Sequence, residues 1–280
     1  MVNIGIRLHD TRPGTLRERL AYARAQGFGC IQLAMGKAVP GFSMADAPRL
    51  LTRELAEEVR EELKRAEMEC AVLGCYLGLT TPDGEAAAKI RGIYEAHLRF
   101  AGWIGARCVG TETPFPGKGN GKAREEEEAY RLFLKCAEPI VRAAEETGTL
   151  LAVEPVCTDI IHTPALAERM LDDLKSDRVG IILDAVNLID SAHAGEAETI
   201  IGEGIRRLGE RTAVLHMKDF EPAPEMPRPR TLPCGKGRMD YTALLRLARE
   251  RALPMTLENT TPENAEETRI WLEEKSREAF

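Results

Sequence analysis

Four polar side chains that are able to bind a metal ion follow four short apolar runs in the second half of the chain. The runs are "LLAVE", "VGIILD", "TAVLH" and "PMTLE", and the residues that end them are Glu154, Asp184, His216 and Glu258. Two Glu, one Asp and one His form an oxygen-rich, mixed set, which suits Mn²⁺, Mg²⁺, Co²⁺ or Fe²⁺ better than a structural zinc site. We therefore predict a bound divalent metal ion, with Mn²⁺ as the first choice and Mg²⁺, Co²⁺ or Zn²⁺ as alternatives.

Each of these residues on its own has an ordinary structural explanation. Glu154 can pair with a lysine in a loop, and Asp184 can cap a helix. His216 can be a core histidine whose hydrogen bonds are satisfied, and Glu258 can belong to a turn. Burying four such groups together is costly unless they are paired or bound to a metal. Their coincidence at four successive runs favours a shared metal site.

The four runs belong to an alternation of strands and amphipathic helices that persists to the end of the chain. Two clear helices cover residues 52–69 and 125–148, with apolar residues at steps of three and four. The predicted strands are Val2–Leu8, Cys30–Ala34, Ala71–Leu77, Cys108–Thr111, Leu150–Pro155, Val179–Asp184, Ala213–His216 and Met255–Glu258.

Eight strands that each precede a helix, in 280 residues, predict a (β/α)₈ TIM barrel forming a single domain over residues 1–280. A doubly wound open sheet shares the alternation and is the structural alternative. However, "GIRLHDTRPG" after the first strand lacks the glycine fingerprint of a dinucleotide site. In a parallel barrel the carboxyl ends of all strands lie on one face, so the four polar residues are able to converge.

Two loops stand out from this alternation. Residues 114–128, "PFPGKGNGKAREEEE", superficially resemble a phosphate loop, but Ala123 stands where that motif needs Ser or Thr, so we predict a mobile surface loop. Residues 221–238 are rich in proline and contain Arg228, Arg230 and Arg238. They follow the seventh strand, and we predict a semi-rigid lid that closes on substrate oxygens at the functional face.

The pattern resembles the xylose isomerase-like TIM barrels, the sugar phosphate isomerase/epimerase superfamily, over nearly the whole chain. "HMKD" is similar to the His-x-Lys-Asp of that superfamily's seventh strand, and "CGKGRMDYTALLRLARERALPMTLEN" resembles its Gly-x-Gly loop, seventh helix and eighth strand. The resemblance implies that Glu154, Asp184, His216 and Glu258 are metal ligands and that Glu154 and Glu258 also act as acid and base. In one departure, Asn187 stands where many sugar epimerases carry a histidine.

A metal with a carboxylate on either side supports isomerisation or epimerisation. One carboxylate removes a proton from the carbon beside a carbonyl, while the metal stabilises the enediolate as a Lewis acid. Return of the proton to the opposite face gives an epimer, and transfer to the neighbouring carbon gives an isomer. We therefore predict a metal-dependent isomerase or epimerase acting on a small sugar or sugar-like ketose.

Further polar residues are candidates for substrate binding because they follow strands or lie in the loops of the same face. Lys218 lies two residues after His216 and hence on the same side of its strand, from which it reaches a substrate oxygen or a liganding carboxylate, or else pairs with Asp219 or Glu112. His162 lies in the loop before a helix N-cap expected at Thr163. The set is Asn187, Lys218, Glu112, His162, Arg238 and His9.

Three other functions are alternatives to this one. A dehydratase or lyase acting on an inositol- or ketose-derived substrate uses the same enolising core. A non-catalytic sugar-binding barrel is a further alternative. An apurinic endonuclease needs additional histidines that the second and third strands lack, and the net charge of −7 disfavours a nucleic-acid partner.

Composition also bears on location and partners. The chain contains no run of about 18 apolar residues, so we predict no membrane span. "MVNIGIRLHD" begins without a basic leader or a signal-peptide segment. Seven scattered cysteines without a CxxC pair indicate reduced thiols. We expect a cytoplasmic protein with a small sugar or polyol substrate and no membrane partner, and either a monomer or a homo-oligomer.

Overall fold

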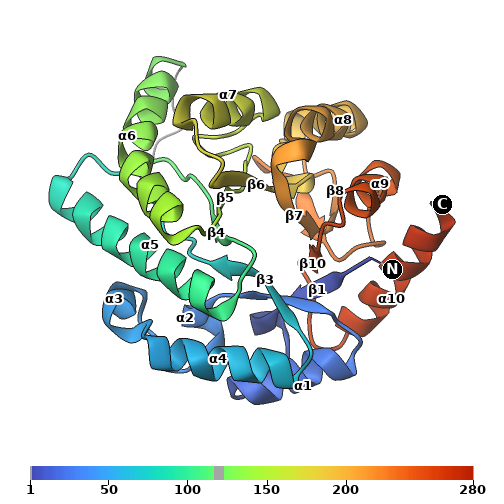
Figure 1. Cartoon of the computed structure of the whole chain (residues 1–280). Helices are drawn as coiled ribbons and strands as arrows, with labels where there is room; N and C mark the ends of the chain where they lie inside the picture. Colours follow the sequence, from blue (N-terminus) through green and yellow to red (C-terminus); the bar gives the residue numbers. More distant parts are fainter. Residues whose placement is uncertain (1, 117–122, 280) are drawn as a thin grey trace.

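A closed ring of eight parallel strands lies at the centre of the structure, which is a computed structural model that describes residues 2–116 and 123–279 (Figure 1). Around the ring the strands follow the order β1-β10-β7-β6-β5-β4-β3-β2. The predicted TIM barrel is confirmed. The barrel strands are β1 (Ile4–Arg7), β2 (Cys30–Leu33), β3 (Glu69–Gly74), β4 (Val109–Thr111), β5 (Leu151–Val153), β6 (Val179–Asp184), β7 (Thr212–Met217) and β10 (Met255–Leu257).

Helices surround the ring (Figure 1). The α-helices are α1 (Leu16–Ala25), α2 (Met35–Ala38), α3 (Ala47–Leu50), α4 (Arg53–Arg65), α5 (Gly84–Ile104), α6 (Ala123–Thr147), α7 (Pro164–Leu174), α8 (Ala197–Leu208), α9 (Thr242–Glu250) and α10 (Ala265–Glu278). The short 3₁₀ turns are η1 (Leu8–Asp10), η2 (Met44–Asp46), η3 (Val186–Leu188), η4 (Ser191–Glu196) and η5 (Gly209–Arg211). Of the described helices, none is both long and apolar enough to cross a membrane.

Side-chain caps fix where several helices begin. Thr52 accepts a hydrogen bond from the backbone of Leu55 at the start of α4, and Thr163 does the same for Leu166 at the start of α7. The predicted helices over 52–69 and 125–148 are thus found as α4 and α6, with α4 ending earlier, at Arg65. The N-cap predicted at Thr163 is confirmed.

The barrel strands differ from the predicted ones mainly at their ends. The first strand is shorter at both ends, and the third ends at Gly74 rather than at Leu77 because the chain turns there into the loop that carries Tyr76. Glu154 and Glu258 each lie one residue beyond their strand, whereas Asp184 and His216 lie within theirs. All four still reach the same end of the ring.

The two unusual loops have different outcomes. Residues 117–122 of the predicted surface loop lie outside the described residues, and residues 123–128 are not loop but the first turns of α6. The loop over 221–238 carries part of a small antiparallel hairpin, in which β8 (Asp219–Glu221) pairs with β9 (Arg230–Leu232). The carboxylate of Asp219 accepts hydrogen bonds from the backbones of Phe220, Gly235 and Met239, so it ties both ends of this loop together.

The interior of the barrel forms a solid floor under the polar residues. Small and medium side chains fill it: Cys30, Ala71, Val72, Cys108, Ala152, Ile182, Ala213 and Val214. A Cβ atom at Gly110 would lie 2.7 Å from Val72 and 2.8 Å from Ile182, so no larger residue fits there. Because side chains two residues apart on a strand face the same way, Ala152, Ile182 and Val214 place Glu154, Asp184 and His216 directly above this floor.

Candidate active site

Strand register brings three of the predicted metal ligands together. Asp184 of β6 pairs directly with His216 of β7, and Glu154 follows β5, the neighbour of β6. One potential ligand atom from each of these residues lies within 4.8 Å of the others, and all three side chains are buried. Glu258 lies beside this trio, with Oε1 3.5 Å from His216 Nδ1.

The histidine carries the clearest sign of a missing partner. Both ring nitrogens of His216 are buried and make no hydrogen bond with the described residues, although Nδ1 lies 3.1 Å from Glu154 Oε2. Buried polar atoms are normally satisfied. Burial alone would lower the pKa of His216, but Glu154 and Glu258 overcome this effect and raise the pKa to about 9. An unsatisfied imidazole between carboxylates fits a divalent cation, because each of these groups is a common ligand of such ions.

Lys218 is the internal counter-ion of this cluster. Its side chain is almost fully buried, and its ammonium nitrogen lies 2.6 Å from Asp184 Oδ2, 3.1 Å from Glu258 Oε2 and 2.9 Å from Asn187 Oδ1. Of the two predicted arrangements, Lys218 therefore adopts the one in which it contacts the carboxylates of the predicted metal ligands, and it does not pair with Asp219 or Glu112. Burial would raise the pKa of Glu258, but Lys218, His216 and Arg7 outweigh it and hold that pKa well below its usual range.

Asn187 orients the cluster from the side. Its amide nitrogen donates to Glu154 Oε1 at 2.6 Å, and its amide oxygen accepts from both Lys218 and Arg228. Arg228 comes from the loop over 221–238, so one of the three arginines predicted to serve the lid does reach the site. Because the amide oxygen accepts from two cations and one amide N–H donates to the carboxylate, Asn187 is held against Glu154.

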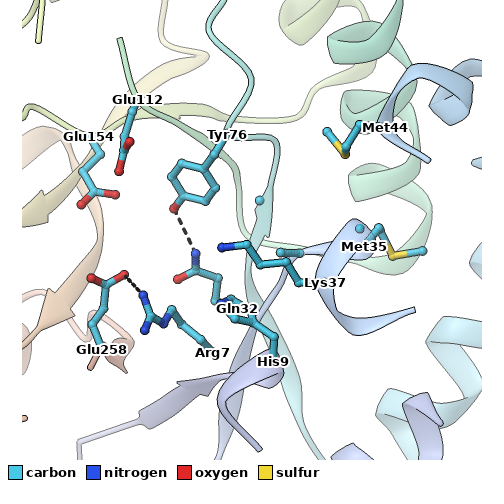
Figure 2. A pocket seen from close by; sticks show the side chains of 13 residues that line it. Arg7, His9, Gln32, Met35, Lys37, Met44, Tyr76, Glu112, Glu154 and Glu258 are labelled. Carbon is cyan, nitrogen blue, oxygen red and sulfur yellow. Dashed lines mark hydrogen bonds and ion pairs between the residues drawn. The ribbon is translucent and has the colours of Figure 1, made fainter. Parts of the chain in front are cut away.

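A cavity of about 270 Å³ opens beside the cluster (Figure 2). Glu112, Glu154 and Glu258 form one side, while Gln32, Lys37 and Tyr76 form the other. Arg7 lies between the two sides, because its guanidinium pairs with Asp10 at 2.8 Å and with Glu258 at 3.4 Å.

Two predicted substrate contacts line this cavity. Burial raises the pKa of Glu112 to about 7, and the neighbouring carboxylates of Glu154, Asp159 and Glu258 add to that effect. Burial lowers the pKa of His9 to about 4, and the positive charges of Arg7 and Lys37 lower it further. Both side chains are therefore neutral or partly neutral groups near neutral pH, able to hydrogen-bond substrate hydroxyls.

Two other predicted contacts do not line this cavity. His162 Nδ1 donates to the backbone oxygens of Asp159 and Ile160, and the side chain lies over a separate depression between α6 and α7. The side chain of Arg238 is exposed, and its one hydrogen bond among the described residues is donated by the backbone N–H to the carbonyl oxygen of Phe220.

Four polar residues of the cavity lining were not predicted from the sequence: Arg7, Gln32, Lys37 and Tyr76. Arg7 ends the first strand two positions after Gly5, and Gln32 lies two positions after Cys30, so both follow the alternation rule that found the acidic residues. Lys37 and Tyr76 lie beyond their strands, and no sequence pattern distinguishes them from ordinary loop residues.

Comparison with known proteins agrees with this architecture. The sequence model described as xylose isomerase-like TIM barrel matches residues 20–275, whereas no curated protein sequence matches the chain. Solved structures with the same fold include a 3-keto-D-glucoside 4-epimerase from E. coli, which is 18% identical with a TM-score of 0.75 over 98% of this chain and 100% of that one.

Two further structures share the fold. The IOLI protein with a binding zinc atom is 17% identical, with a TM-score of 0.71 over 99% of this chain and 96% of its own. A probable 3-DHS dehydratase from Bacillus anthracis is 15% identical, with a TM-score of 0.67 over 92% of both chains. At these identities the structures show the fold alone, and the matched family model covers most of the 280 residues. The chain belongs to the xylose isomerase-like TIM-barrel family.

Proposed function

We propose that the protein is a divalent-metal-dependent isomerase or epimerase of a small sugar or sugar-like ketose. The observation that carries the proposal is a group of three buried side chains, Glu154, Asp184 and His216, whose potential metal-ligand atoms lie within 4.8 Å of one another, and of which Glu154 lines the cavity. The sugar epimerases that share the fold support the reaction class. The zinc atom in the IOLI protein supports a bound divalent metal ion.

The donor set fits such an ion. Glu154, Asp184 and His216 would hold it, with Glu258 as a fourth ligand, and Mn²⁺ is the ion that the mixed oxygen and nitrogen set suits best. Asp184 already accepts from Lys218 and from the backbones of Val186 and Asn187, but carboxylate oxygens have about four lone-pair positions and retain capacity for a metal. When bound, the ion would act as a Lewis acid on neighbouring carbonyl and hydroxyl oxygens of the substrate.

The chain itself supplies the proton transfer. Glu154 and Glu258 both line the cavity and reach it from opposite sides of the cluster, after β5 and β10. One removes the proton beside the carbonyl, and the other returns a proton to the opposite face or to the neighbouring carbon. Lys218 and Arg7 keep Glu258 ionised, while the amide of Asn187 holds Glu154 in place.

A dehydratase is the second candidate, and the dehydratase among the solved structures of this fold is the observation that favours it. The same proton removal followed by loss of a β-hydroxyl would give an unsaturated product. Net loss of water separates this outcome from isomerisation.

The test combines metal analysis with solvent exchange. The purified protein, loaded with Mn²⁺, is incubated in D₂O with a panel of ketoses, keto-glycosides and inosose-like polyols, and deuterium at carbon is followed by NMR and mass spectrometry. We expect about one Mn²⁺ per chain, lost in His216→Ala, and exchange at one carbon without change of mass beyond deuterium. A protein that binds no divalent ion, or that exchanges no carbon-bound proton of any panel member, would contradict the proposal.

A further inference from the structure

The cavity has two chemically different sides, and the mechanism above uses one of them. The acidic side, with Glu154 and Glu258, is where a reacting carbon would lie. The opposite wall consists of Gln32, Lys37 and Tyr76, which come from β2, α2 and the loop after β3 (Figure 2). None of these three residues has a part in the proton transfer.

Lys37 is a cation with no acidic partner among the described residues. Its side chain is exposed to the cavity, where Figure 2 shows its amino group directed toward Gln32 and Tyr76. The amino group makes no ion pair or hydrogen bond with any described residue. Arg7, the other cation of the lining, already pairs with Asp10 and Glu258. Among the described residues, Lys37 is therefore the cation of this cavity whose charge remains uncompensated.

Beside this lysine, Gln32 has a buried polar atom that makes no hydrogen bond with the described residues. The side chain is 3% exposed, its amide nitrogen donates to the Tyr76 hydroxyl at 3.1 Å, and its amide oxygen is buried without a hydrogen bond. A tyrosine hydroxyl can donate or accept, so either orientation of the amide leaves one end unsatisfied. Such an atom in a cavity wall costs free energy unless a ligand supplies the missing hydrogen bond.

We propose that Gln32, Lys37 and Tyr76 form a second substrate-binding subsite, which takes a sugar-like substrate with a free hydroxyl and an anionic group at the end remote from the reacting carbon. The hydroxyl donates to Gln32, and a carboxylate or phosphate pairs with Lys37. The inference rests on the proposed function, because that function places the reacting carbon at Glu154 and Glu258. A cavity of about 270 Å³ is small compared with common ligand sites of about 300–1,000 Å³, so the substrate has the size of a single sugar.

Two matched pairs of sugars test whether the subsite binds an anionic group. The affinity of the Mn²⁺-loaded protein for D-fructose is compared with that for D-fructose 6-phosphate, and D-glucose is compared with D-glucuronate, by calorimetry. We expect at least one anionic member to bind about tenfold more tightly than its neutral partner, since hydrogen bonds to charged groups are of that strength. The pair with the larger preference identifies phosphate or carboxylate as the group recognised.

Substitutions assign the preference to residues. Lys37→Met should reduce the preference to about twofold or less, whereas Lys64→Met, an exposed lysine at the other end of the barrel, should leave it unchanged. Gln32→Leu should weaken the binding of both sugars of a pair equally, because both make the hydroxyl contact. Equal affinity within each pair, no binding of either anionic sugar, or a preference that survives in Lys37→Met would overturn the inference.

The proposed function fails in a different way. Absence of bound Mn²⁺ and of carbon–deuterium exchange would end the metal-dependent mechanism, even if the preference for anions is present. Exchange with neutral ketoses that shows no preference for anions would end only the subsite.

Discussion

The two sides of the cavity differ in how the protein holds their polar groups. On the acidic side, Lys218 contacts three acceptors and Asn187 links Glu154 to that lysine, so the carboxylates are held in place before anything binds, and the ring nitrogens of His216 are left without hydrogen bonds among the described residues. On the opposite side, Gln32 is half satisfied and Lys37 is unpaired among the described residues. The first arrangement is suited to chemistry that needs fixed geometry, and the second to recognition of a ligand that completes it.

The largest expected effect is on the acidic side, at the two proposed bases. Glu154→Gln and Glu258→Gln keep the shape of the side chain but remove the proton acceptor, so each should lower the rate about 10²–10⁴-fold. Activity must be measured at saturating metal, because each substitution also removes a ligand charge. If the two residues act as separate bases, one variant should still exchange the proton of one epimer in D₂O without completing turnover.

Two results would contradict this two-base assignment. Full activity in either variant would exclude a role in proton transfer. Equal and complete loss of exchange from both epimers in both variants would mean that the glutamates serve only to hold the metal.

The next effect concerns stability rather than rate. Lys218→Met leaves Asp184 and Glu258 buried without their ammonium partner, and breaking a buried ion pair in this way typically costs about 3–5 kcal/mol. Denaturant unfolding of the metal-free protein should show this loss, and Mn²⁺ should stabilise the variant more than the parent protein, because the ion replaces the missing charge.

A matched surface pair controls for the loss of a lysine. Lys236 pairs with Glu267 at 3.0 Å, and both side chains are more than half exposed, so Lys236→Met should cost about 0–1 kcal/mol. If Lys218→Met lowers the free energy of unfolding by no more than Lys236→Met does, the carboxylates do not require the buried ammonium.

The difference between the two sides also explains what the sequence could and could not predict. Asp184 and His216 end long apolar strands, so one rule about strand ends identified both and, with the barrel, placed them on one face. Arg7 ends β1 and Gln32 lies one residue before the end of β2, so both follow the same alternation, but neither is a common type of metal ligand, and a rule based on metal ligands at strand ends does not identify them.

Other residues lie outside the reach of such a rule. Lys37 lies in a four-residue helix and Tyr76 in a loop, and their approach to the cavity depends on the path of those segments. Arg228 and Arg238 occur in the same basic loop, yet only Arg228 turns inward, because the β8–β9 hairpin and the Asp219 hydrogen bonds fix the course of the chain. These are tertiary effects that local pattern does not encode.

A smaller effect is expected at Asn187, which supports the acidic side without being a base. Asn187→Ala removes the hydrogen bond to Glu154 Oε1 and one acceptor of Lys218. Groups that orient metal ligands typically contribute about 10–100-fold to metal affinity or activity. Titration of the variant with Mn²⁺ measures this loss, and a metal affinity equal to that of the parent protein would show that Glu154 needs no such support.

The smallest effects are expected in the loop over 221–238. Of two arginines that lie ten residues apart there, one makes a structural contact and the other is an exposed charge. Arg228 is half-buried and hydrogen-bonds Asn187, so Arg228→Ala should weaken the same support and lower kcat/KM by about tenfold, the usual strength of a charged hydrogen bond. Arg238 is exposed, and its described contact is through the backbone, so Arg238→Ala should change the free energy of transition-state binding by about 0.5 kcal/mol or less. Both effects are measured as the change in kcat/KM with a sugar that shows deuterium exchange with the parent protein. A large loss in Arg238→Ala with little change in Arg228→Ala would reverse this order, and would mean that the loop moves on substrate binding so that Arg238 closes over the cavity.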